Sequence, residues 1–323
     1  MAETHPQQHA TALDELREEL PVVWRAIPRK GLFFTLLGAW LAVFHFLGNP
    51  TFGYIATPSL LGWLNMAYNR PGSEDSHGNL MPLVVLGLVW WKRRKLQQIA
   101  AALWWPGLFL LAAAGVLHWL GFAVQQPRVS VIAMLLGIYA LVATVWGRGI
   151  AREIAFPYVL LIFCVPLGDL VEPLTVPLRQ FSTDITVIIA RHGLGIPVLQ
   201  EGVLLLDPRG AYQYEVAAAC SGINSLVTLL VLTSVYGVVT FSTGWKRLVM
   251  VSLALPLAVA GNVLRLVSII VAAEGFGRAA GEFVHEWFGF LTFGLGLAAM
   301  LAVGHWLREP KPAVVGAVAS RAT

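Results

Sequence analysis

Long apolar segments recur along the whole chain, and they constrain its fold more than any other feature. Eight such segments lie at 31–49, 78–91, 103–122, 129–147, 154–171, 221–241, 247–271 and 286–307. Most of them approach the ~20 residues that a helix needs to cross about 30 Å of hydrocarbon. The segment 78–91 is shorter, but Trp90, Trp91 and four basic residues at its end are typical of a cytoplasmic boundary. We predict an all-α polytopic membrane protein with about eight transmembrane helices.

The composition indicates that lipid is the main solvent of this chain. Hydrophobic residues make up 57% of its 323 residues and charged residues only 12%, and the mean hydropathy is +0.70. Soluble chains carry roughly 25% charged residues, so soluble and disordered classes are excluded. The net charge of +4 is compatible with nucleic-acid binding. Lys and Arg of a multipass protein gather at the cytoplasmic side instead, so we predict a lipid bilayer and no nucleic acid as partner.

The distribution of basic residues predicts the orientation. With both termini inside, 15 of the 22 Lys and Arg residues fall in cytoplasmic segments, six fall outside, and Arg265 lies within a span. The positive-inside rule therefore favours cytoplasmic N and C termini. We divide the chain into an N-terminal cytoplasmic tail (1–30), one transmembrane domain (31–307) and a C-terminal cytoplasmic tail (308–323).

One outer loop, residues 172–220, is too long for a simple turn. Its first half, PLRQFSTDITVIIARHGLG, has amphipathic helical spacing and predicts a short helix on the membrane surface. Its second half, EGVLLLDPRGAYQYEV, predicts a β-hairpin around Asp207-Pro208-Arg209-Gly210. Loops of this length inside a compact protein are usually functional.

The loop ends at Cys220, which opens the next span in the sequence AAACSGINSL. At a helix N-terminus, the positive end of the helix dipole favours the thiolate, which is the nucleophilic form of cysteine. The small residues Ser221 and Gly222 would let a substrate backbone approach the thiol. A buried structural cysteine is the alternative interpretation.

Two more polar residues are expected at the same outer depth. Arg265 lies 18 residues beyond Arg247 at the inner boundary, which is roughly 27 Å along a helix. A charge inside the bilayer is a functional candidate, although snorkelling to the headgroups would also explain it. Asn262 shares its helical face and could hold the guanidinium or a substrate carbonyl. His285 begins the last span, 23 residues before Arg308, and could also be an ordinary interfacial residue.

Together, Cys220, Arg265 and His285 supply the groups that thiol-dependent acyl transfer requires. An imidazole accepts the thiol proton and returns it to the leaving amine. A guanidinium stabilises the oxyanion of the tetrahedral intermediate. The sequence contains no HExxH, Walker A or GxGxxG motif and no His/Cys ligand spacing. We therefore predict no metal and no cofactor.

These motifs, in this order, resemble those of the exosortase/archaeosortase family of multipass membrane transpeptidases. Residues 219–222 (ACSG) resemble the family's cysteine motif, 262–265 (NVLR) its N-x-x-R motif, and His285 its histidine before the last helix. Residues 76–96, which begin Ser-His-Gly, resemble a fourth segment of the bacterial members. The resemblance runs from about residue 31 to 307.

The resemblance implies a cysteine protease and transpeptidase of a bacterial cytoplasmic (inner) membrane whose active site faces the periplasm. Its substrates would be secreted proteins with a PEP-CTERM-like sorting signal, which consists of a short motif, a hydrophobic helix and a basic tail. Cys220 would form a thioester, with His285 as acid/base and Arg265 as oxyanion stabiliser. An amine, lipid or glycan would accept the new C-terminus. His77 would shape a substrate loop. Ala218 replaces an acidic residue found in many members, which leaves the preferred motif open.

Two alternatives remain at the level of sequence. A non-catalytic transporter or exopolysaccharide-export component would carry polar residues near mid-membrane on several spans, and this sequence has few. A membrane cysteine hydrolase would use the same acyl-enzyme and differ only in the attacking nucleophile. Residue patterns do not separate this hydrolase from a transpeptidase.

Overall fold

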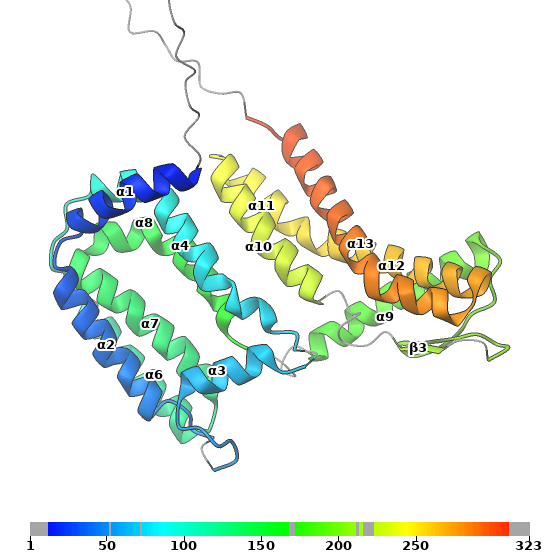
Figure 1. Cartoon of the computed structure of the whole chain (residues 1–323), viewed down its shortest axis with the longest axis horizontal. Helices are drawn as coiled ribbons and strands as arrows, with labels where there is room; N and C mark the ends of the chain where they lie inside the picture. The colour runs from blue at the N-terminus through cyan, green and yellow to red at the C-terminus, as the bar shows by residue number, and fades with distance from the viewer. Residues whose placement is uncertain are drawn as a thin grey trace, which may run out of the picture. The chain divides into compact units, whose positions relative to one another are not determined.

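The computed structural model describes residues 12–51, 53–71, 73–167, 172–210, 213–215 and 223–309. Within these ranges most residues are helical, and the strands form one small sheet. The chain divides into two compact units, with the division after Leu167. Figure 1 labels most of the helices of both units and strand β3.

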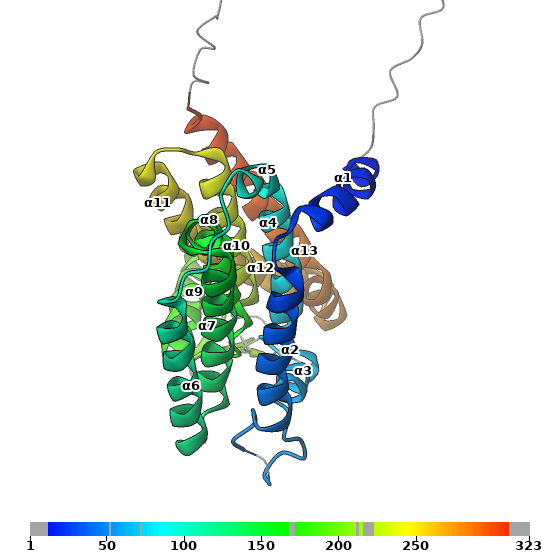
Figure 2. The ribbon, with the colours of Figure 1, turned by 90° about the vertical axis from the view of Figure 1, so that its left-hand side faces the viewer.

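The first unit is built from helices and two short 3-10 turns. Its elements are α1 (Ala12–Ala26), α2 (Lys30–Phe46), α3 (Leu60–Asn69), η1 (Ser76–Asn79), α4 (Met81–Trp91), α5 (Arg93–Gln97), α6 (Gly107–Ala123), α7 (Pro127–Trp146), α8 (Arg148–Val159) and η2 (Leu160–Cys164). Helix α7 is its centre, because α6 runs along it and α2 and α8 also pack against it (Figure 2).

The packing of α2 on α7 depends on a glycine. The indole of Trp40 lies against Gly137, where a Cβ atom would approach the ring to 2.2 Å. The indole Nε1 donates a hydrogen bond to the backbone carbonyl of Met134 at 3.0 Å. Small residues allow helices to approach closely in membrane proteins, where apolar burial alone does not drive association. This contact therefore sets the register of α2 on α7.

The segment that begins Ser-His-Gly forms η1, directly before α4. Gly78 is buried beneath Tyr68, where a Cβ atom would lie 2.4 Å from the ring. The Tyr68 hydroxyl donates a hydrogen bond to the backbone carbonyl of Cys164, and the Cys164 thiol donates to the carbonyl of Gly78 at 3.8 Å. Cys164 is thus a buried structural thiol that joins α3, η1 and η2.

Among the described residues, the second unit combines five α-helices and one π-turn with the sheet. Its elements are α9 (Glu172–Ile188), the π-turn η4 (Ile189–Gly193), β1 (Leu199–Glu201), β2 (Leu204–Leu206), β3 (Gln213–Glu215), α10 (Ile223–Thr240), α11 (Gly244–Ser252), α12 (Ala254–Phe276) and α13 (Arg278–Trp306). Helices α12 and α13 form its main helix pair, and α9 and α10 also pack on α12 (Figure 1). The sequence predicts a surface helix over 177–195, and α9 followed by η4 covers this segment as far as Gly193.

The predicted hairpin is present, and it has one more strand than expected. Strands β2 and β3 pair antiparallel, and the backbone N–H of Gly210 donates to the carbonyl of Asp207 at 2.9 Å to close the turn. Strand β1 pairs with β2 on the other side, so the order is β1-β2-β3. Gly202, with φ +64°, lies in the two-residue turn between β1 and β2. The sequence predicts β2 and β3 from the run of turn residues Asp207 to Gly210 between them, and the connection from β1 to β2 has no such run.

A buried cluster holds the sheet against the helices of this unit. It contains Val187 of α9, Ala190 of η4, Val198, Leu205 of β2, and Leu266, Ile269 and Ile270 of α12. Each member is at most 6% exposed. Because the cluster joins α9, η4, β2 and α12, it packs the sheet on α12.

Glycines on α13 let it approach its neighbours closely. A Cβ atom at Gly304 would lie 2.4 Å from the ring of Tyr236 on α10, and one at Gly296 would lie 3.8 Å from Leu229. These two glycines are eight residues apart and face the same neighbour. Such small-residue seams are typical of helix packing in membranes.

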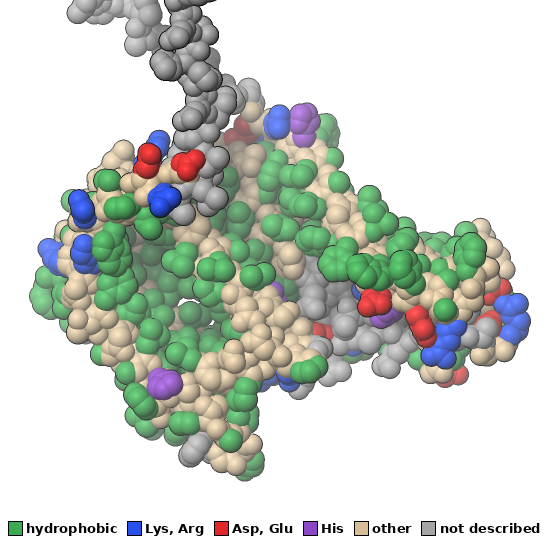
Figure 3. Space-filling model, in the orientation of Figure 1, with side chains coloured by type: hydrophobic (Ala, Val, Ile, Leu, Met, Phe, Trp, Pro, Cys, Tyr) green, Lys and Arg blue, Asp and Glu red, His purple; other side chains and the backbone are tan. Residues whose placement is uncertain are grey.

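Several helices of the described residues are suited to a membrane. Those long and apolar enough to cross it are α7, the continuous stretch of α11 and α12 (Gly244–Phe276), and α13. The pair Arg17–Ala26 and Lys30–Phe46, bent by 90°, is a fourth candidate. Large apolar side chains are exposed on helices of both units (Figure 3). The number of eight spans and the cytoplasmic position of both termini stay predictions.

Two predicted spans differ from the helices found. Helix α4 has 11 residues, which is about 16 Å of helix and too short to cross the hydrocarbon core. The predicted span 154–171 is interrupted, because α8 ends at Val159 and the chain continues as the 3-10 turn η2. Pro157 lies within the last turn of α8 and has no backbone N–H to continue the ladder.

Candidate active site

Arg265 and His285 meet across the pair formed by α12 and α13. The Nη2 atom of Arg265 donates a hydrogen bond to the backbone carbonyl of His285 at 2.5 Å. Both residues are half-buried. The sequence predicts that these two residues lie at the same depth, and the structure places them in contact. Helix α13 begins at Arg278, so His285 lies two turns inside the helix and not at its start.

The guanidinium of Arg265 lies over Gly289, one turn beyond His285. A Cβ atom at Gly289 would be 3.6 Å from Cζ, 3.7 Å from Nη1 and 3.8 Å from Nη2 of Arg265. A side chain larger than alanine would therefore compete with the guanidinium for this space. Gly289 leaves the surface of α13 open, so the arginine can reach a backbone carbonyl of the neighbouring helix.

Asn262 lies one turn before Arg265 and faces the same small cavity. The cavity has a volume of about 20 Å³ and is lined by Asn262, Arg265 and Thr292, by Gly261 and Gly289, and by Leu229, Leu257, Ala258 and Phe293. Asn262 is only 6% exposed. Its Nδ2 atom and the Nε atom of Arg265 are buried without a hydrogen-bond partner among the residues that the structure describes. The N-x-x-R motif thus places two buried donors at one cavity.

Cys220, Ser221 and Gly222 lie outside the described residues. Strand β3 ends at Glu215 and α10 begins at Ile223, so both elements that flank the cysteine belong to the second unit. The convergence of the thiol with Arg265 and His285 stays a prediction.

His77 belongs to the first unit, within η1. Its Nδ1 atom lies 3.1 Å from the backbone carbonyl of Glu74. Since a carbonyl only accepts, Nδ1 carries the proton and a neutral ring exposes Nε2 as an acceptor. This local contact supports a role in loop structure, and substrate binding by His77 stays a prediction.

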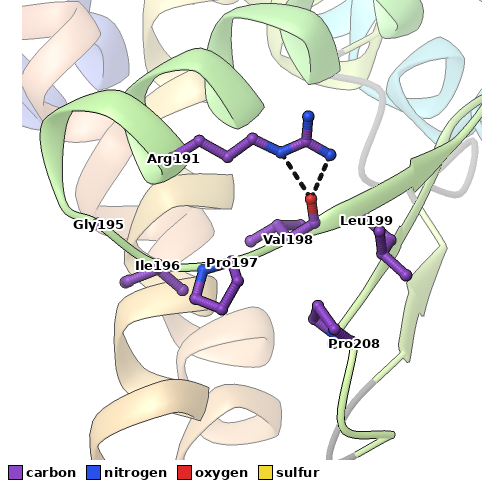
Figure 4. Close-up of a pocket in the computed structure, with 7 residues that line it drawn as sticks. All are labelled: Arg191, Gly195, Ile196, Pro197, Val198, Leu199 and Pro208. Carbon is purple, nitrogen blue, oxygen red and sulfur yellow. Dashed lines mark hydrogen bonds between the residues drawn. The ribbon is translucent and has the colours of Figure 1, made fainter.

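The sheet of the second unit borders another cavity, which the sequence does not predict. It has a volume of about 520 Å³ and is lined by Arg191, Gly195, Ile196, Pro197, Val198, Leu199 and Pro208 (Figure 4). Arg191 donates from Nε and Nη2 to the backbone carbonyl of Val198, at 2.8 and 2.5 Å. The arginine therefore ties η4 to the chain entering β1. A signal in the sequence was the Arg-His-Gly-Leu-Gly-Ile-Pro run, which breaks the helical period.

Arg209 links the hairpin turn to the end of α12. Its Nη2 atom donates to the carboxylate of Glu274 at 2.5 Å, and its Nε atom lies 3.4 Å from that of Asp207. The hydrogen bond that Arg209 donates to Glu274, together with the charges of the Glu274 and Asp207 carboxylates, raises the pKa of the Arg209 guanidinium. Among the described residues, no group of three His, Cys, Asp or Glu side chains is arranged to hold a metal ion.

The apolar helices identify a multi-pass membrane protein. Residues 63–302 match the family model of the transmembrane exosortases. This match covers more than half of the chain and includes Ser76, Cys220, Arg265 and His285. The chain therefore belongs to the transmembrane exosortase family, as its sequence motifs predict. No curated protein and no solved structure matches the chain.

Proposed function

We propose that this protein is a membrane-embedded cysteine protease and transpeptidase that processes the C-terminal sorting signal of secreted proteins. The observation that carries the proposal is the contact between Arg265 and His285 on α12 and α13. In a member of the exosortase family, this contact brings a cation and an imidazole-bearing residue to one side of a helix pair. Placing a charge among apolar helices costs free energy, so a charge found there indicates a functional site.

The proposed reaction has two steps. His285 takes the proton of the Cys220 thiol, and the resulting thiolate attacks the carbonyl carbon of the scissile peptide. His285 then gives this proton to the leaving amine as the C–N bond breaks. This leaves a thioester on Cys220. The nucleophile of an acceptor then attacks the thioester carbonyl and gives its proton to His285, and the C–S bond breaks as His285 returns this proton to the departing thiolate. Arg265 stabilises the oxyanion in both tetrahedral intermediates.

The proposed substrates are secreted proteins with a PEP-CTERM-like tail, which carries a hydrophobic helix followed by a basic cluster. The tail helix lies in the bilayer beside the enzyme, and the motif reaches the periplasmic face of a bacterial inner membrane. The acceptor is an amine, a lipid or a glycan. The predicted outer depth of Arg265 and His285 supports this orientation.

The test is co-expression with tail-bearing secreted proteins encoded in the same genome. Substrate size on a gel is compared for the wild type, Cys220→Ala and Cys220→Ser, with Cys164→Ala as matched control. Cys164 lies in the first unit and is not part of the proposed site, so Cys164→Ala should still process the substrate when it is expressed at the wild-type level. Loss of processing only in the Cys220 variants supports the proposal, and continued processing by Cys220→Ala refutes it.

Mass spectrometry of the processed substrate separates transfer from hydrolysis. A transpeptidase leaves the new C-terminus linked to an acceptor, which adds mass. A hydrolase leaves a free carboxylate. Absence of processing by well-expressed wild-type protein favours a non-catalytic membrane component.

A further inference from the structure

Two residues that line the small cavity among α10, α12 and α13 have buried donors that no described residue accepts from. Asn262 and Arg265 both line it, and the Nδ2 atom of Asn262 and the Nε atom of Arg265 are buried without a hydrogen-bond partner among the described residues. A buried donor left unsatisfied destabilises the folded state, so two such donors at one cavity point to a shared acceptor.

Thr292 of α13 provides the third polar group of this cavity. Its hydroxyl donates to the backbone carbonyls of Phe288 and Gly289, at 3.0 and 3.2 Å. Because its hydrogen is used in this way, the oxygen is available only as an acceptor. The residue is 7% exposed. The cavity thus offers two donors and one acceptor to whatever occupies it.

The cavity volume limits the occupant. About 20 Å³ exceeds the roughly 10–15 Å³ that a single water molecule requires. It does not hold a carboxylate, a phosphate or a peptide group. Buried waters typically make about three hydrogen bonds, which is the number of polar groups present.

We propose that one buried water molecule bridges Asn262, Arg265 and Thr292, and that Asn262 and Thr292 are positioning residues for the arginine. The water accepts from Asn262 Nδ2 and Arg265 Nε and donates to Thr292 Oγ1. The guanidinium is then held at Nη2 by the carbonyl of His285 and at Nε by the water. Nη1 is left to face a substrate oxyanion, which is the part of this inference that rests on the proposed function.

The test compares Thr292→Val with Thr292→Ser and with a matched threonine. Thr186 of α9 is also buried and donates to the carbonyl one turn earlier, at 2.8 Å, but it does not line the cavity. We expect Thr292→Val to lower the maximal processing rate about tenfold, with little change in the substrate concentration at half-maximal rate. Thr292→Ser keeps the hydroxyl and should restore the rate, and Thr186→Val should stay within about twofold of wild type.

A second measurement does not depend on activity. An experimental density map of the full-length protein should contain a peak within hydrogen-bond distance of Asn262 Nδ2, Arg265 Nε and Thr292 Oγ1, and this peak should be absent from Thr292→Val. A wild-type map without the peak overturns the water bridge. A map with the peak, combined with a wild-type rate for Thr292→Val, overturns the positioning role. If wild type processes no substrate, the proposed function fails while the map still tests the water.

Discussion

Arg265 on α12 donates a hydrogen bond to the backbone carbonyl of His285 on α13. The two residues are 20 positions apart in sequence and are brought together only because the chain reverses between Phe276 and Arg278. A backbone carbonyl holds the arginine whatever the protonation state of the histidine ring. A change in the protonation state of the ring therefore does not require release of the arginine.

Replacement of Arg265 by lysine should abolish most of the activity. A lysine has one nitrogen and cannot bond the carbonyl of His285 while it also faces the cavity and the substrate. Loss of an oxyanion donor lowers rates by about 10²–10³, and we expect a loss of this size for Arg265→Lys in single-turnover processing. Arg278→Lys is the control, since that side chain is 73% exposed at the start of α13. Equal single-turnover processing rates for both variants would show that Arg265 does not act in the reaction.

The space over Gly289 should be needed for activity more than for folding. In Gly289→Leu, the new side chain displaces the Arg265 guanidinium, and a displacement of about 1 Å can cost a hundredfold in rate. Gly294 lies on the same helix with no atom of the described residues within 4 Å of a Cβ, so Gly294→Leu is the matched control. Processing rates of the two variants, at equal expression in the membrane, test this prediction. Similar rates would contradict it.

The segment before α4 should be sensitive to a single methyl group. In Gly78→Ala, the new Cβ would lie 2.4 Å from the Tyr68 ring, which is itself buried. Overpacking of this kind costs roughly 1–3 kcal/mol, so the melting temperature in detergent should fall. Gly87 of α4 has open space at its Cβ position among the described residues, and Gly87→Ala should not lower the melting temperature. A melting temperature of Gly78→Ala equal to wild type would show that the segment repacks freely.

The end of α13 should be anchored in a pH-dependent manner. Hydrogen bonds from the Ser242 hydroxyl, and then from Thr243 and the Ser242 backbone, lower the pKa of Glu309 from 4.5 to about 2. A carboxylate with a depressed pKa contributes its stability above the unfolded-state pKa and loses it as the pH falls. The stability difference between wild type and Glu309→Gln should be constant at neutral pH and shrink as the pH falls from 4.5 toward 2. Thermal unfolding at several pH values measures this, and a pH-independent difference would contradict it.

The sequence predicted most helices and the β2–β3 hairpin correctly for a physical reason. Inside lipid, backbone hydrogen bonds must be satisfied within each segment, so a long apolar run such as 129–147 folds as a helix. The turn residues Asp207 to Gly210 similarly predict a hairpin from local conformational preference alone. The local sequence does not reveal that Pro157 and η2 interrupt the run 154–171, because most residues on both sides of the break are apolar.

The sequence by itself determined the class of protein, the helical segments and the types of residue available for chemistry, since these follow from composition, period and motif order. Only the tertiary structure decided which groups meet. The contact of Arg265 with His285, the open surface at Gly289 and the cavity shared with Thr292 all depend on how α13 is rotated against α12. That rotation is set by packing between side chains far apart in the chain, and a hydropathy pattern does not encode it. The N-x-x-R motif identifies Asn262 and Arg265 as donor residues, and the packing of the helices determines where their side chains lie.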